Sequence, residues 1–345
     1  MDSPFVSVII PAFNAEGYIA RAIESVLGQT HGNLELVVVD DGSTDATAEA
    51  ARRAFNGDER ARLVSIANVG PAEARNRGLD ELDTRADYVM FVDADDHIAP
   101  DTVEYALAGA ARGAELVIMG FTIANPDGTH RDYFEPEAVL DGETLGEALP
   151  RLYTANMLNQ VWAKLFSAPL LRRGALRFPD YRWGEDRLFI FDCLERAGRV
   201  AVLPECKYYY VMHEGESLIS RYYDKKPEVC CLADARMQAL CARFGTKNDA
   251  GCRYMFVKSI FSCMTTLFSP SCALDYPGKR AYVRAILKNE QVQARSRGAF
   301  GSAPVKIMCA VMHTKLVWLN LLMFRAVAFV GRATPRLFMA LKHKK

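Results

Sequence analysis

The 345-residue chain lacks the glycine-rich sequences by which many proteins bind a phosphate group. It contains neither the G-x-G-x-x-G pattern of dinucleotide-binding proteins nor the G-x-x-x-x-G-K-[ST] pattern of P-loop proteins. These absences argue against a dinucleotide-dependent dehydrogenase and against a P-loop NTPase. A nucleotide bound by this chain is therefore expected to be held by other means.

Cysteine pairs with metal-ligand spacing are also absent. The nine cysteines lie between Cys193 and Cys309, their number is odd, and no C-x-x-C pair occurs. We expect neither a disulfide framework nor a zinc site, and a reducing cytosol is the simplest setting. The amino terminus has no basic stretch before its short apolar run, so we expect no signal peptide. Four cysteines at eleven-residue intervals are interpreted as small core residues: Cys230, Cys241, Cys252 and Cys263.

Acidic residues are missing from the last part of the chain. The sequence holds 42 basic and 42 acidic residues, but no Asp or Glu follows Glu290, whereas ten of the basic residues do. The segment up to 290 thus carries a net charge of −10 and the remainder +10. A basic tail indicates an anionic surface as partner, and no nucleic acid is expected among the partners.

Apolar runs long enough to span a bilayer are absent too. The nine residues "LVWLNLLMF" between Lys315 and Arg325 are almost wholly apolar, whereas a spanning helix needs about twenty. With basic residues on both sides and Trp318 inside, the stretch fits a helix in a bilayer interface. The alternative is a C-terminal helix that packs on the protein core.

Strand-like and helical patterns alternate in the first third of the chain. The β-branched runs at 5–10 and 34–39 predict buried strands, and the residues between them have helical spacing. Strand, helix and strand predict a parallel crossover unit. The pattern continues with strands at 62–67, 87–93 and 114–123, which together predict a doubly wound α/β sheet.

The rest of the chain has a different texture. Residues 125–150 are polar and punctuated by Pro and Gly, which predicts a flap or connecting segment. The runs "RVAVLP" and "KYYYVMH" predict two further strands, and the pattern after about 226 is mostly helical. We place a domain boundary near residue 225.

Carboxylates gather where the predicted strands end. Asp40 and Asp41 close one strand, and Asp93, Asp95 and Asp96 close another in "VMFVDADD". Ligands of an open α/β sheet bind beyond the carboxyl ends of its strands, so these side chains should line one site. An anionic phosphate fits there only with a divalent cation, and Mg²⁺ or Mn²⁺ binds both carboxylate and phosphate oxygens. A single Asp at a strand end is, however, also common in turns and helix caps.

Four blocks, in order and spacing, resemble the bacterial family 2 inverting glycosyltransferases with the GT-A fold. The blocks are "VSVIIPAFNAEGYIARAIESVLGQTHGNLELVVVDDGSTDAT", "NVGPAEARNRGLD", "YVMFVDADDHIAPD" and "WAKLFSAPLLRRGALRFPDYRWGEDRLF". The resemblance covers residues 5 to about 220. It implies a GT-A type nucleotide-sugar-binding, doubly wound sheet with a C-terminal helical region. The catalytic domain would span 1–225, with a nucleotide-binding half at 1–120 and an acceptor half at 121–225, followed by the helical region at 226–345.

The resemblance also implies roles for the matching residues on the donor side. Positions that hold the base and ribose of the sugar nucleotide are matched by Pro11, Asp41, Asn68 and Arg75. Asp93 matches the first Asp of the D-x-D pair and faces the ribose. Asp95 matches the second, which binds the Mn²⁺ or Mg²⁺ that bridges both phosphates. Asp96 would assist through water or by orienting its neighbour.

Glu185 and Asp186 match the family's E-D pair. Asp186 is expected to be the general base that deprotonates the acceptor hydroxyl, on the side opposite the leaving diphosphate. One base on one face predicts inversion at the anomeric carbon. Without the resemblance, acids at the start of a helix are explained equally well by the helix dipole.

Further matching residues concern the acceptor and the phosphates. Trp162, Lys164 and Trp183 lie in blocks that face the acceptor in similar enzymes, where an aromatic ring can stack on a sugar and a lysine can hold a phosphate. Each is equally reasonable as a core or surface residue. His213 or Arg221 would close over the diphosphate from the loop after "KYYYVMH", although many members have an Arg near His213 where this chain has Val and Met.

Together these features predict a metal-dependent transferase that moves a sugar from a UDP-sugar to a glycan or lipid-linked glycan in cell-surface polysaccharide synthesis. The expected location is cytoplasmic, peripheral at the inner face of the plasma membrane. Two alternatives stay open: transfer to a polyprenyl phosphate, and a non-catalytic nucleotide-sugar-binding protein. No short motif specifies the donor sugar or the acceptor.

Overall fold

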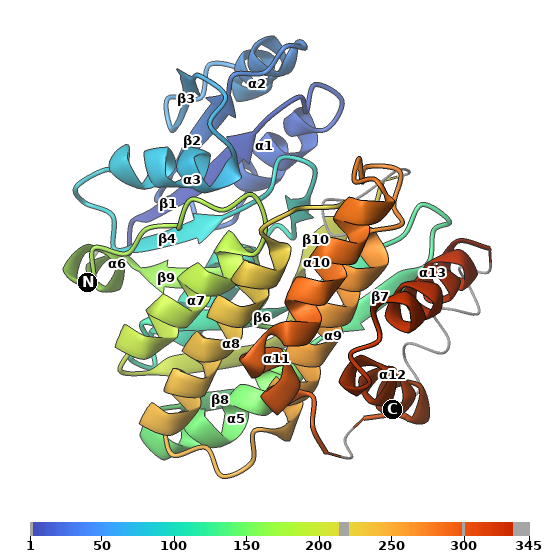
Figure 1. Ribbon diagram of the computed structural model, residues 1–345. Helices are drawn as coiled ribbons and strands as arrows, with labels where there is room; N and C mark the ends of the chain where they lie inside the picture. Colours follow the sequence, from blue (N-terminus) through green and yellow to red (C-terminus); the bar gives the residue numbers. More distant parts are fainter. Residues whose placement is uncertain (1–2, 214–220, 299–300, 334–345) are drawn as a thin grey trace. The chain divides into compact units, whose positions relative to one another are not determined.

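The structure, a computed structural model, describes residues 3–213, 221–298 and 301–333 (Figure 1). The chain divides into two compact units. The first comprises Met1–Glu214 and Leu240–Lys247, and the second comprises Gly215–Ala239 and Asn248–Lys345. The domain limits expected from the sequence stay a prediction.

Among the described residues, the first unit contains one sheet of ten strands. The strands are β1 (Val6–Ala12), β2 (Leu34–Asp41), β3 (Ala61–Ile66), β4 (Tyr88–Phe91), β5 (His97–Ile98), β6 (Leu116–Ala124), β7 (His130–Tyr133), β8 (Ala138–Leu140), β9 (Lys164–Ser167) and β10 (Val200–Val211). Their order is β3-β2-β1-β4-β9-β6-β10-β5, with β7 beside β6 and β8 beside β10.

The direction of the strands divides the sheet into two parts. β3, β2, β1 and β4 are parallel to one another, as the crossover pattern predicted. β9 runs antiparallel to both β4 and β6, and it separates the parallel pair β6 and β10 from the first four strands. The carboxyl ends of β1, β2 and β4 therefore meet at one edge, where the acidic residues lie.

Helices connect and cover these strands. They are α1 (Ile19–Leu27), α2 (Thr47–Phe55), α3 (Pro71–Asp80), α4 (Thr102–Ala110), α5 (Gly142–Thr154), α6 (Ala168–Arg173) and α7 (Glu185–Arg196). α1 and α2 contact each other, while α3 packs on β1 and β2. This packing requires Gly78 on α3, because a Cβ there would lie 2.5 Å from the Cγ2 atom of Ile9. The short distance between α3 and β1 positions Arg75, one turn earlier on α3, near the end of the sheet.

Two details of the sequence prediction are wrong. "RVAVLP" and "KYYYVMH" form one strand, β10, because register shifts on either side of Cys206 accommodate Pro204 within it. A proline is tolerated in a sheet at such an irregularity. The segment 125–150, expected to be a flap or connecting segment, contributes β7, β8 and most of α5.

The second unit is helical where it is described, as expected. Its helices are α8 (Lys226–Arg243, with the last four residues assigned to the first unit), α9 (Ala250–Thr266), α10 (Tyr276–Lys288), α11 (Glu290–Arg295), α12 (Ala303–His313) and α13 (Val317–Ala333). The four regularly spaced cysteines are buried on α8 and α9, which confirms them as core residues. Within the described residues, no helix is both long enough and apolar enough to cross a bilayer.

Candidate active site

Arg75 joins the two acidic motifs that the sequence singled out. Its Nη2 atom donates to Asp93 Oδ1 over 3.0 Å, and its Nη1 atom donates to Glu185 Oε1 over 3.1 Å and to Asp186 Oδ1 over 2.8 Å. Asp93 follows β4, whereas Glu185 and Asp186 form the first turn of α7. One guanidinium thus brings together carboxylates that lie more than 90 residues apart in the chain.

The surroundings of Arg75 strengthen these ion pairs. The side chain is buried, and its guanidinium lies over the ring of Phe178, 5.6 Å from the ring centre. Burial by itself favours the neutral form, but the three carboxylates outweigh it and raise the pKa of Arg75. The resemblance assigned Arg75 to the base and ribose pocket. In the structure its two terminal nitrogens contact the three carboxylates, and its role at the nucleotide stays a prediction.

The Asp186 side chain is partly accessible to solvent, and its pKa is higher than that of an ordinary aspartate. Gly184, at φ +82°, provides the left-handed turn that leads into α7 and places Glu185 and Asp186 at the helix start. Burial raises the pKa of Asp186 to about 8, with Arg75 opposing the rise and Glu185 and Asp93 adding to it. Burial likewise raises the pKa of Glu185. A carboxyl that titrates near neutral pH is suited to general base catalysis.

Lys164 and Trp162 are both buried, and their contact with an acceptor stays a prediction. Lys164, at the start of β9, is 1% exposed, and its Nζ atom donates to the Trp162 carbonyl over 3.3 Å. Burial lowers its pKa to about 7, although the nearby Asp186 acts to raise it. Trp162 is also buried and stacks on Tyr208, with ring centres 4.6 Å apart. Trp183 is only half-buried, with the Arg187 guanidinium 5.2 Å from its ring centre.

Asp96 connects the D-x-D turn to β10. The Asp93 backbone N–H donates to the Tyr208 hydroxyl over 3.1 Å, and that hydroxyl donates to Asp96 Oδ2 over 2.6 Å. The Val211 N–H donates to the other oxygen, Asp96 Oδ1, over 2.9 Å. Asp96 is fully buried, and burial raises its pKa well above the usual range. Asp96 therefore holds the turn in place and does not face the solvent-accessible side of the site.

Asp95 and His213 form the part of the site that best fits a divalent cation. His213 Nε2 lies 3.7 Å from Asp95 Oδ2, and the imidazole packs against the Tyr18 ring at 4.2 Å between centres. Within the described part of the chain, this buried Nε2 has no hydrogen-bond partner. No group of three or more His, Cys, Asp or Glu side chains there is already arranged around a metal. The two side chains fit a cation whose coordination is completed by phosphate oxygens and water.

The residues predicted to hold the base lie at the ends of the neighbouring strands. Asp41, the last residue of β2, is buried and accepts hydrogen bonds from the Val69 and Gly70 N–H groups, each over 2.8 Å. Asn68, in the same β3–α3 loop, is exposed, and Pro11 near the end of β1 is half-buried. Asp41 thus holds the loop that carries Asn68, and this loop leads directly into α3.

Sequence reasoning missed two aromatic residues that shape the site. Tyr208 was seen only as part of a strand, although alternation along "YYY" places Tyr208 and Tyr210 on the same face of β10. Phe178, which lies under Arg75, carried no signal in the sequence. Residues 214–220, on which the predicted closure over the diphosphate depends, lie outside the described residues. Arg221, the first residue described after them, is exposed.

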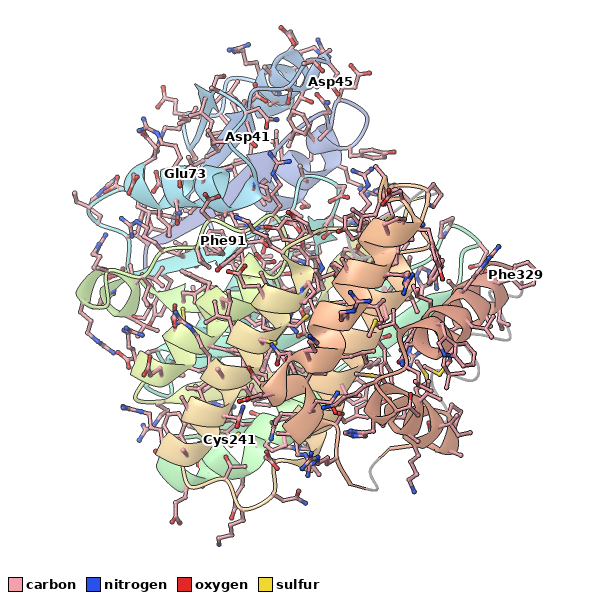
Figure 2. All side chains as sticks on the ribbon, viewed as in Figure 1. Asp41, Asp45, Glu73, Phe91, Cys241 and Phe329 are labelled. Carbon is pink, nitrogen blue, oxygen red and sulfur yellow. The ribbon has the colours of Figure 1, made fainter. Side chains whose placement is uncertain are left out.

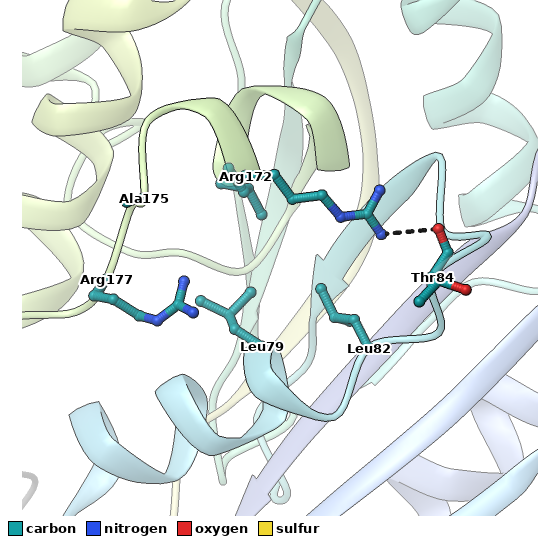
Figure 3. A pocket seen from close by; sticks show the side chains of 7 residues that line it. Leu79, Leu82, Thr84, Arg172, Ala175 and Arg177 are labelled. Carbon is teal, nitrogen blue, oxygen red and sulfur yellow. Dashed lines mark hydrogen bonds between the residues drawn. The ribbon is translucent and has the colours of Figure 1, made fainter.

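A separate hollow of about 560 Å³ contains none of the predicted site residues (Figure 3). One side of the hollow is formed by the end of α3 and the residues after it, and the other side by α6 and the residues after it. The Arg172 side chain extends across the hollow and donates to the Thr84 carbonyl over 3.3 Å. The lining residues are Leu79, Leu82, Thr84, Leu171, Arg172, Ala175 and Arg177. The carboxylate cluster around Arg75, and not this hollow, is the candidate site.

Comparison with known proteins identifies the class to which this fold and site belong. The sequence profile of glycosyl transferase family 2 matches residues 7–171. An uncharacterized glycosyltransferase of Haemophilus influenzae is 32% identical over 197 residues, which are 56% of this chain and 74% of that protein. The chain belongs to glycosyl transferase family 2, as the resemblance predicted.

Other relatives and a solved structure agree. The uncharacterized glycosyltransferase EpsJ of Bacillus subtilis is 32% identical over 60% of this chain, and the succinoglycan biosynthesis protein ExoO of Rhizobium meliloti is 34% identical over 61%. The chain spans 61% and 62% of the lengths of these two proteins. TarS 1–349 of S. aureus, solved with UDP-GlcNAc, has a TM-score of 0.68 at 22% identity and covers 95% of this chain and 92% of its own. This likeness confirms the predicted GT-A type fold.

Proposed function

We propose that the chain is a metal-dependent inverting glycosyltransferase that moves a sugar from a nucleotide-diphosphate donor, preferably a UDP-sugar, to a glycan or lipid-linked glycan in cell-surface polysaccharide synthesis. The observation that carries the proposal is the cluster in which Arg75 joins Asp93 to Glu185 and Asp186. Support for the donor comes from the UDP-GlcNAc complex of TarS, and support for polysaccharide synthesis comes from the name of ExoO.

The donor would lie over the carboxyl ends of β1, β2 and β4. Pro11, Asp41 and Asn68 would surround its base, and Asp93 would face its ribose. Asp95 and His213 would hold Mn²⁺ or Mg²⁺ at the diphosphate. When bound, such a cation stabilises the negative charge that builds up on a departing nucleoside diphosphate.

Asp186 would take the proton from the acceptor hydroxyl. Arg75 keeps part of the Asp186 population ionised near neutral pH, because its positive charge opposes the effect of burial. With a single displacement on the face opposite the diphosphate, the anomeric configuration is inverted. Trp183, the most accessible of the predicted acceptor residues, would contact the incoming sugar.

Thermal unfolding with UDP and Mn²⁺ tests the donor and metal parts of this proposal. A ligand at about 100 times its Kd stabilises the fold by about 2.7 kcal/mol, enough to raise the Tm by several degrees. We expect this rise for the unmodified chain with UDP and Mn²⁺, and no rise in chelator or in Asp95→Ala. Asp101→Ala, which removes an aspartate of similar exposure that precedes α4 and pairs with Lys207, is the matched control and should keep the rise. Equal stabilisation by UDP in chelator would contradict the proposal.

A further inference from the structure

Helix α13 is an integral part of the second unit along one side. It contacts α9, α10 and α12, and its Asn320, Leu321 and Phe324 side chains are buried. The Phe324 ring packs against Phe261 of α9, with ring centres 5.6 Å apart. Asn320 Nδ2 donates to the Val311 carbonyl over 3.1 Å, which ties α13 to α12. The helix is therefore docked on protein, as one of the two alternatives from the sequence predicted.

The opposite side of α13 is apolar and exposed. Trp318 and Leu322 are each 60% exposed and Phe329 is 70% exposed, with the exposed Arg325 between them. Positions 318, 322, 325 and 329 follow helical spacing and form one stripe, here named the α13 stripe. Figure 2 labels Phe329, which projects outward from α13. A group of large exposed apolar side chains on a protein surface often marks a site that binds a protein or a membrane.

The charge around the stripe favours a particular partner. No Asp or Glu occurs after Glu290, whereas Lys306, Lys315 and Arg325 on or near α12 and α13 are basic. A tryptophan and other large apolar side chains beside cations are typical of helices that lie in the interface of an anionic bilayer. A symmetric pair of these stripes would place Arg325 and its basic surroundings against their own copies, which is unfavourable.

We propose that the α13 stripe docks on an anionic lipid bilayer. Trp318, Leu322 and Phe329 enter the interface, and Arg325 with the neighbouring lysines contacts lipid headgroups. Because the other side of α13 is packed on protein, the helix lies along the surface. The inference rests on the proposed function in one respect: a glycosyltransferase bound to the bilayer surface is close to lipid-linked acceptors. Binding itself needs neither donor nor acceptor.

Vesicle co-sedimentation of the full chain tests the proposal. We expect binding to vesicles containing phosphatidylglycerol and little binding to pure phosphatidylcholine, with release at high salt. The double substitution Leu322→Glu with Phe329→Glu should lower the bound fraction at least tenfold. Phe134→Glu, which alters a side chain 57% exposed in the first unit, is the matched control and should bind normally. The substituted side chains Leu322, Phe329 and Phe134 are all exposed, so the Tm of these variants should change little. Point substitutions are preferred to a deletion of the residues after 300, because the deletion would remove the buried Cys309 and Met312 side chains.

Tryptophan emission gives a second readout. Trp318 is the exposed one among the three tryptophans, so anionic vesicles should shift the emission to the blue in the unmodified chain and not in Trp318→Phe. If the double variant does not fold, Arg325→Glu replaces it and should also weaken binding.

Three results would overturn the inference. They are no binding of the unmodified chain to anionic vesicles, unchanged binding of the stripe variants, and a dimer in light scattering that the stripe variants dissociate without any lipid binding. The last result would assign the stripe to a second copy of the chain. The stripe variants should show the same thermal shift with UDP and Mn²⁺ as the unmodified chain. A failure of the donor proposal can therefore be distinguished from a failure of the membrane proposal.

Discussion

Replacing Arg75 with methionine should shift the pH dependence of transfer, because Arg75 is the cation paired with Asp186. The substitution keeps an unbranched stem and removes the guanidinium whose Nη1 lies 2.8 Å from Asp186 Oδ1. Loss of an opposite charge at contact distance changes a carboxyl pKa by about 1–3 units. The pKa of Asp186, about 8 in the structure, should therefore rise, since the burial and the two neighbouring carboxylates that raise it stay in place.

The size of the effect follows from the ionised fraction of Asp186. With a pKa of about 8, about a tenth of Asp186 is ionised at pH 7, and each unit of further rise lowers this fraction about tenfold. We expect kcat/KM at pH 7 to fall by about 10- to 1,000-fold in Arg75→Met, with part of the loss recovered at higher pH. Arg75→Lys keeps the positive charge but loses the forked geometry of the guanidinium. Its kcat/KM at pH 7 should therefore lie between those of the unmodified chain and of Arg75→Met.

The assay is the pH profile of kcat/KM for donor consumption, measured on variants whose folding has been checked by circular dichroism. This check matters because breaking a buried ion cluster costs about 3–5 kcal/mol of stability. Arg77→Met, which removes an exposed arginine of the same helix paired with Glu81, should leave the profile unchanged. If Arg75→Met kept the original acid limb and raised only the KM for the donor, the ionisation argument would be wrong. Arg75 would then act at the nucleotide, as the resemblance implied.

Two further predictions concern the chemistry and the framework of the site. Asp186→Asn should lower kcat by about 10²- to 10⁴-fold, because the general base is lost. The thermal shift with UDP and Mn²⁺ should be retained, because the residues proposed to hold the donor are unchanged. Undiminished turnover would favour transfer to a polyprenyl phosphate, which needs no base. Gly42→Ala should lower the free energy of unfolding by about 1–3 kcal/mol more than Gly57→Ala in urea denaturation. Both glycines have positive φ, but only a Cβ at Gly42 would meet a backbone atom, the Asn68 nitrogen at 2.7 Å, so equal losses would refute the role of this close approach.

Much of the nucleotide-binding half could be predicted from the sequence. The β-branched runs in β1 and β2 and the apolar residues 89–91 of β4 are buried, and such runs carry a signal that is local in the chain. The polar residues that end these runs, Asp41 and Asp93, necessarily lie at the carboxyl edge of a parallel sheet. The family resemblance then added Asp186, whose position in the fold no local pattern indicates.

What the sequence by itself determined is the alternation of strands and helices, the edge at which the acids gather, and the apolar and basic character of the last helices. Only the tertiary structure decided that Arg75 pairs with Glu185, 110 residues away, that Lys164 and Trp162 are buried, and that α13 has one packed side and one exposed side. The physical reason is that strand and helix propensities arise from neighbours in the chain. Burial, charge pairing and pKa depend on groups that folding alone brings together.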